Sequence, residues 1–94
     1  MSPYRTQPVT AGDIRRGTIR IPIVGPTKRL FPLERGRVEV DLRGSRKTCR
    51  WHPHYDADQE RSGVIGIGIA LLNAHVTEGE QLAVEARDGV FYLL

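Results

Sequence analysis

A run of basic and small residues in the first quarter of the chain is suited to binding an anion. Arg15 and Arg16 are followed by Gly17 and Thr18. A guanidinium group donates several hydrogen bonds in one plane, which matches phosphate oxygens and the edge of guanine. These residues are therefore either contacts to nucleic acid or solvated turn residues. Further cations that could reach phosphates are Arg20, Lys28 and Arg29.

A polar segment over residues 52–61 combines hydrogen-bond donors and acceptors suited to base edges in the major groove. Pro53 and the scarcity of apolar residues predict a loop of about ten residues, a length that is often functional. The candidate contacts in this loop are His52, His54, Tyr55, Asp58, Gln59 and Arg61.

The histidines could instead suggest a metal site. Cys49 is followed by His52 and His54, and His75 lies further along the chain. A structural zinc site needs four ligands, usually as two close pairs, and the second pair is missing here. We therefore expect no metal, with these two histidines in a loop and Cys49 buried as a small apolar residue.

No group of residues has the spacing of a catalytic site. The acid pairs Asp56/Asp58 and Glu78/Glu80 have no nucleophile or histidine placed by sequence to join them. The glycines of residues 63–68 reverse the dinucleotide-binding spacing and fit a strand that bends at a barrel corner. We predict that the chain is not an enzyme and uses no cofactor.

Positive charge is concentrated in the first half of the chain. Residues 1–50 hold twelve of the fourteen basic residues and four acids, which gives this half a charge of +8. Residues 51–94 hold two basic residues and seven acids, a charge of −5, so the chain carries +3. This asymmetry favours a polyanionic partner if the fold keeps the cations on one face. The other explanation is an arginine-rich but merely solvated surface.

Length and composition indicate one intracellular domain. The 94 residues suffice for a single small core. A single cysteine cannot form the disulfides that small secreted domains usually need. The sequence has no apolar run near the roughly 18 residues that span a bilayer and no apolar signal core in residues 1–11. We expect a cytoplasmic domain over residues 9–94, preceded by a flexible lead-in over residues 1–8.

Alternating apolar and polar residues predict several short strands. Residues 18–22 and 37–43 alternate clearly and predict strands. Gly44 to Lys47 are predicted to form a turn, and residues 48–51 the second strand of the hairpin. Thr10-Ala-Gly-Asp13 is typical of a helix cap or turn. Further strands are expected at 9–10, 63–68, 80–85 and 90–94, and helical turns at 27–31 and 69–75. The inner face of the central hairpin is expected to carry Val38, Val40, Leu42, Cys49 and Trp51.

Six or seven short strands in so small a chain must close on themselves to bury their apolar faces and edges. The fold class is therefore mainly β with one or two short helices, arranged as a small open β-barrel. The glycines and prolines between the strands supply the turns that such an arrangement needs.

The order of these pieces resembles a known family. In sequence they are Val9 to Ile14, Ile19 to Pro22, Lys28 to Pro32, Val38 to Trp51, Ser62 to Leu72 and Glu78 to Leu82. Over residues 9–86 they resemble the DNA-binding pseudobarrel of plant B-three transcription-factor domains and of amino-terminal effector domains of type II restriction endonucleases. Two departures are Ile69, where the family has tryptophan after the glycine, and Glu80, where aspartate is usual.

The resemblance implies that two loop arms grip the major groove of double-stranded DNA. The arms would be residues 15–18 and 52–61, and restriction, defence or gene regulation would depend on another chain or catalytic subunit. The main alternative is a small β-barrel adaptor in a larger assembly, whose apolar segment over residues 90–94 pairs with another chain's edge. RNA binding is a third hypothesis, although the chain has few aromatic residues free to stack on bases.

Overall fold

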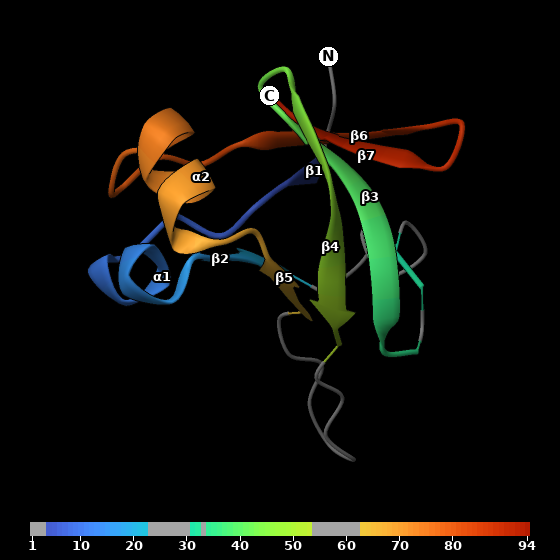
Figure 1. Ribbon diagram of the computed structural model, residues 1–94, viewed down its shortest axis with the longest axis horizontal. Coiled ribbons are helices and arrows are strands. Elements are labelled where there is room, and N and C mark those ends of the chain that lie inside the picture. The colour runs from blue at the N-terminus through green and yellow to red at the C-terminus, as the bar shows by residue number, and fades with distance from the viewer. Residues whose placement is uncertain (1–3, 23–30, 33, 54–62) are drawn as a thin grey trace.

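The computed structural model describes residues 4–22, 31–32, 34–53 and 63–94, which form seven strands and two helices (Figure 1). In chain order these are β1 (Tyr4–Arg5), α1 (Ala11–Arg16), β2 (Thr18–Ile21), β3 (Gly36–Leu42), β4 (Ser45–His52), β5 (Gly63–Gly66), α2 (Ile69–His75), β6 (Ala83–Arg87) and β7 (Val90–Leu93). The expected mainly β class is confirmed. Neither described helix has the length and apolar character needed to cross a membrane.

The strands form one sheet in the order β1-β6-β7-β3-β4-β5-β2. All neighbours are antiparallel except β3 and β7, which run parallel. The two ends of the sheet meet where the chain leaves β1. There Thr6 N–H donates to the Leu82 carbonyl at 2.9 Å, and Gln7 N–H donates to the Arg20 carbonyl on β2 at 2.8 Å. The sheet is therefore a nearly closed barrel, as the strand pattern predicted (Figure 1).

The central β3–β4 hairpin follows the alternation in the sequence. Its apolar residues alternate into the core, and the residues of the opposite face are polar or charged. The turn between the strands is Arg43-Gly44, tighter than the predicted turn over residues 44–47. Both turn residues have positive φ, 50° and 98°, which matches the right-handed twist of a two-residue hairpin. The predicted inner face is confirmed: Val38, Val40, Leu42, Cys49 and Trp51 all lie in the core.

Trp51 closes one part of the core. Its indole Nε1 donates to the Pro32 carbonyl at 2.9 Å, which satisfies its only polar group. Phe31 stacks between Trp51 and Phe91, with ring centroids 4.7 Å and 4.1 Å away. Gly63 makes room for the indole, because a Cβ there would lie 2.0 Å from the Trp51 ring. The expectation that Trp51 serves the core is confirmed.

The segment expected as a lead-in contains the first strand, Tyr4–Arg5, which pairs with β6, while residues 9–10 do not form the strand predicted there. Pro8 has no backbone N–H, so it cannot donate a hydrogen bond to a neighbouring strand. Val9 instead makes turn-like bonds, donating to the Glu80 carbonyl at 2.8 Å and accepting from Gly79 N–H at 2.6 Å.

The terminal hairpin forms as predicted around Asp88-Gly89, but its last strand is not an edge. β7 is bonded to β6 on one side and to β3 on the other. The hypothesis that residues 90–94 pair with another chain's edge is therefore wrong, because the backbone groups of this strand are already used. The predicted helix over residues 69–75 is confirmed as α2.

Candidate nucleic-acid interface

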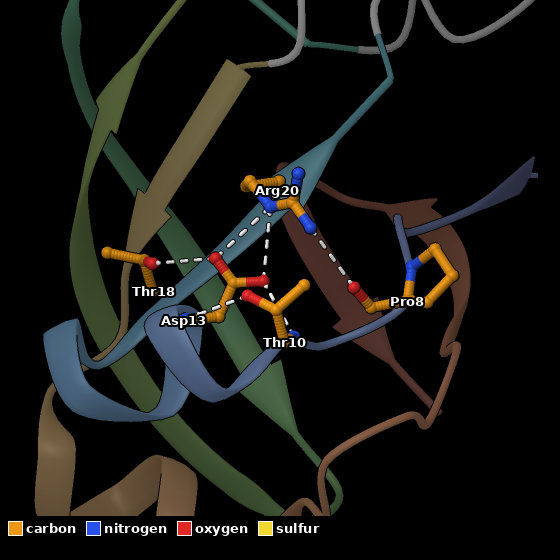
Figure 2. Close-up of polar contacts among 5 residues, drawn as sticks. All are labelled: Pro8, Thr10, Asp13, Thr18 and Arg20. Atoms are coloured by element: carbon orange, nitrogen blue, oxygen red, sulfur yellow. Dashed lines mark hydrogen bonds and ion pairs between the residues drawn. The ribbon is translucent and has the colours of Figure 1, made fainter.

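The first helix begins with a reciprocal cap. Thr10 Oγ1 accepts a hydrogen bond from Asp13 N–H at 3.1 Å, and Asp13 Oδ2 accepts one from Thr10 N–H at 3.0 Å (Figure 2). This capping box satisfies two backbone donors that a helix start leaves without partners. It explains why only six residues suffice to form α1 here.

Asp13 also ties α1 to β2. Arg20 Nε lies 3.1 Å from both carboxylate oxygens, and Thr18 Oγ1 donates to one of them at 3.3 Å (Figure 2). Arg20 extends the network by donating to the Pro8 carbonyl at 3.2 Å. Burial alone would raise the pKa of Asp13, but the Thr10 hydrogen bonds and the Arg20 guanidinium together hold it below its ordinary value. Thr18 and Arg20, predicted as DNA contacts, therefore serve to seat the helix.

The segment expected to be a bare turn is instead the end of this helix. Arg15 and Arg16 form the last turn of α1, and Gly17 caps it in the left-handed conformation with φ of 69°. A Cβ on Gly17 would lie 2.5 Å from backbone atoms of Gly68 and Ile69. The Gly17 carbonyl accepts from Ile67 N–H and Gly68 N–H at 2.8 and 2.9 Å. The start of α2 thus locks the end of α1 in place.

Arg16 then projects over a hollow on the outer face of the sheet. This hollow has a volume of about 420 Å³, and its lining contains four cations and no acid. Lys47 is held there by a 2.8 Å hydrogen bond from its Nζ to the Ile67 carbonyl. The lining residues are Arg16, Gly17, Arg37, Lys47, Thr48, Arg50, Gly66 and Gly68.

A second hollow of about 430 Å³ shares Arg37 and Arg50 with the first. Its other lining residues are Arg35, Gly36, Trp51 and His52. We call the two hollows together the arginine groove, defined by the cations Arg16, Arg35, Arg37, Lys47 and Arg50.

Arg37 and Arg50 stand directly opposite each other in the β3–β4 register. Like charges at directly opposite positions repel each other, so this pair does not stabilise the fold. Among the described residues, no carboxylate forms an ion pair with Arg16, Arg35, Arg37 or Arg50. An anionic partner would remove the repulsion.

Four arginines elsewhere in the described part of the chain have acidic partners. Arg20 pairs with Asp13 at 3.1 Å, Arg43 with Glu80 at 3.2 Å, Arg46 with Asp41 at 3.9 Å and Arg87 with Glu85 at 3.6 Å. The arginine groove therefore differs from these sites in its lack of acids and not in its residue type.

The predicted contact residues are only partly brought together. Arg16 and His52 line the arginine groove, whereas Arg15 lines a separate hollow between the helices that also contains Glu78. Lys28, Arg29, His54, Tyr55, Asp58, Gln59 and Arg61 lie outside the described residues. Sequence reasoning missed Arg35, Arg37, Lys47 and Arg50. Arg37 and Arg50 could have been found, because the alternation that buries Val38 and Cys49 turns both arginines outward.

Of the residues considered for metal binding, His54 lies outside the described residues, and the others form no metal site among themselves. Cys49 is buried in the core, and burial raises the pKa of its thiol. His75 Nε2 lies 3.0 Å from Ser45 Oγ. Within the described ranges, no group of three histidine, cysteine, aspartate or glutamate residues is placed to hold a metal ion.

Comparisons of this chain with models of protein families, with curated proteins and with solved structures find no match.

Proposed function

We propose that this chain binds double-stranded DNA, with the arginine groove on the phosphate backbone. The observation that carries the proposal is the opposed Arg37–Arg50 pair, which forms no ion pair with a described acid and is flanked by Arg16, Lys47 and Arg35. Opposed like charges lower the stability of the fold. A guanidinium group can donate two parallel hydrogen bonds to the oxygens of one phosphate.

Sequence reading is the finer part of the proposal. His52 lies at the rim of the groove, and the segment that follows it carries the side chains suited to base edges. Phosphate contacts would fix the orientation of the duplex, and base contacts from this segment would select a site. A nuclease or regulatory activity would reside on another chain.

The test is a salt titration of binding to a short DNA duplex, measured by fluorescence anisotropy. Removing two phosphate contacts with Arg37→Ala/Arg50→Ala should lower the slope of log K against log salt by about 1.8, at roughly 0.9 per contact. The matched control is Arg46→Ala/Arg87→Ala, which removes the same charge from arginines that already have acidic partners. The control should keep the slope of the unaltered protein.

Absence of duplex binding by the unaltered protein at low salt would overturn the proposal and favour an adaptor role. Equal losses in the two double variants would also contradict it, because they would show a response to net charge alone. Selection from a random duplex pool tests the finer part, since a sequence-reading module should enrich a motif.

A further inference from the structure

The glycines around the arginine groove fall into two groups. Gly17 and Gly68 have positive φ, 69° and 105°, and Gly63 leaves room for the Trp51 ring. These three have a structural reason to lack a side chain. Gly66, the last residue of β5, and Gly36, the first residue of β3, have none of these reasons.

Neither backbone conformation nor packing requires glycine at these two positions. Neither residue is among those with positive φ. A Cβ on Gly66 would meet only Arg50 Cβ at an ordinary 3.8 Å, and a Cβ on Gly36 would meet nothing within 4 Å. A strand glycine with no such demand marks either a bend in the sheet or a place where another molecule approaches the backbone closely.

Only Gly66 shares the outer face with the repelling arginine pair. Across this face, the register places Thr18, Gly66, Arg50 and Arg37 side by side on four successive strands. Gly66 is therefore a notch next to Arg50, in the first hollow. Gly36 lines the second hollow but lies opposite Trp51, so a side chain there would point to the other face of the sheet.

We infer that the two hollows seat two neighbouring phosphates of one nucleic-acid strand, with Arg37 and Arg50 shared between them and Gly66 giving the backbone close access. The inference rests on the proposed function and specifies which part of the DNA occupies the groove. Two guanidinium groups held side by side can each donate paired hydrogen bonds to phosphate oxygens, so one phosphate on each side would relieve their mutual repulsion. The sugar–phosphate chain could then lie against the sheet only at a position occupied by glycine.

The test fills the notch without changing any charge. Gly66→Val adds a β-branched side chain, which suits a strand. It should weaken binding to a short DNA duplex about tenfold and lower the salt slope by roughly 0.9, the value of one phosphate contact. The matched control is Ala86→Val, which adds bulk at an exposed position of β6 away from the groove. It should leave binding unchanged.

Circular dichroism and thermal melting would verify that each variant folds. If Gly66→Val does not fold, Gly66→Ala replaces it, because its single methyl group fits beside Arg50 and should still reduce affinity about threefold. If the unaltered protein binds the duplex and the Gly66 variant keeps the same affinity and the same salt slope, this inference is overturned and the proposed function stands. No duplex binding by the unaltered protein would overturn both.

Discussion

The outer face of the β3–β4 hairpin has two ends that use arginine in opposite ways. Near the hairpin turn, Arg46 lies opposite Asp41 and donates to Tyr92 Oη at 3.1 Å. Arg87 stacks over the Tyr92 ring at 4.3 Å and pairs with Glu85. We call these five residues the paired end. The other end of the same two strands holds the opposed Arg37 and Arg50 of the arginine groove.

The contrast separates two roles of one residue type. At the paired end each guanidinium has an acid or an aromatic ring beside it, which contributes modestly to stability. In the arginine groove no described acid forms an ion pair with an arginine, and the directly opposed Arg37 and Arg50 repel each other. Positive charge that the fold does not neutralise is available to a ligand, and its position is what the proposed function depends on.

The largest effect is expected where α1 is fastened to form one wall of the groove. Gly17→Ala should destabilise the protein by about 3 kcal/mol, because it combines left-handed strain with a backbone clash against Gly68 and Ile69. Gly89→Ala, in the turn beside the paired end, has only the strain, since nothing lies within 4 Å of its Cβ. It should cost about 1 to 2 kcal/mol. Urea unfolding measures both, and equal losses would refute the locking role of Gly17.

A smaller effect is expected from the buried carboxylate that seats the same helix. Asp13→Asn should lower stability by about 2 kcal/mol at neutral pH, because the Arg20 guanidinium loses its charged acceptor. The lowered pKa of Asp13 in the folded protein means that this contribution is complete above its unfolded value near 3.8. It is lost as pH falls through the folded pKa.

The difference in unfolding free energy between Asp13→Asn and the unaltered protein should therefore shrink on acidification below about pH 4. Glu80, whose pKa is also lowered, first by the Thr77 N–H and then by Arg43, is present in both proteins and cancels in the difference. A difference that stays constant down to pH 2 would contradict the ionised state proposed for Asp13.

The smallest effect gives the most direct test of the contrast between the two ends. Arg37→Glu places a carboxylate opposite Arg50 and should stabilise the fold by about 0.5 kcal/mol at low salt. Arg46→Glu places one opposite Asp41 and should destabilise it by a similar amount. Thermal melting at low and high salt would show opposite signs that converge as salt screens the charges. A stability change of the same sign in both variants would contradict the contrast between the arginine groove and the paired end.

Local sequence patterns determined much of this fold. The alternation of Val38, Val40 and Leu42 predicts both a strand and its buried face, because side chains on a strand alternate with a period of two. The Thr10-to-Asp13 spacing predicts the start of a helix, because a cap joins residues three apart. Asp88-Gly89 predicts a hairpin, because its turn requires positive φ.

Only the tertiary structure decided which strands became neighbours. The parallel pairing of β3 with β7 joins segments about half the chain apart, and β1 is too short to show any alternation. The sequence suggested Thr18 and Arg20 as DNA contacts, but in the structure both side chains donate hydrogen bonds to the buried Asp13 carboxylate.

The arginine groove combines α1, β3, β4 and β5, and it exists because strand pairing and the packing of α1 bring these segments to one surface. The sequence by itself determined that the first half of the chain is basic and that Arg37 and Arg50 alternate with core residues. It could not determine that no described acid would form an ion pair with them. Electrostatic neighbours are set by the distance between atoms, which the order of residues along the chain does not specify.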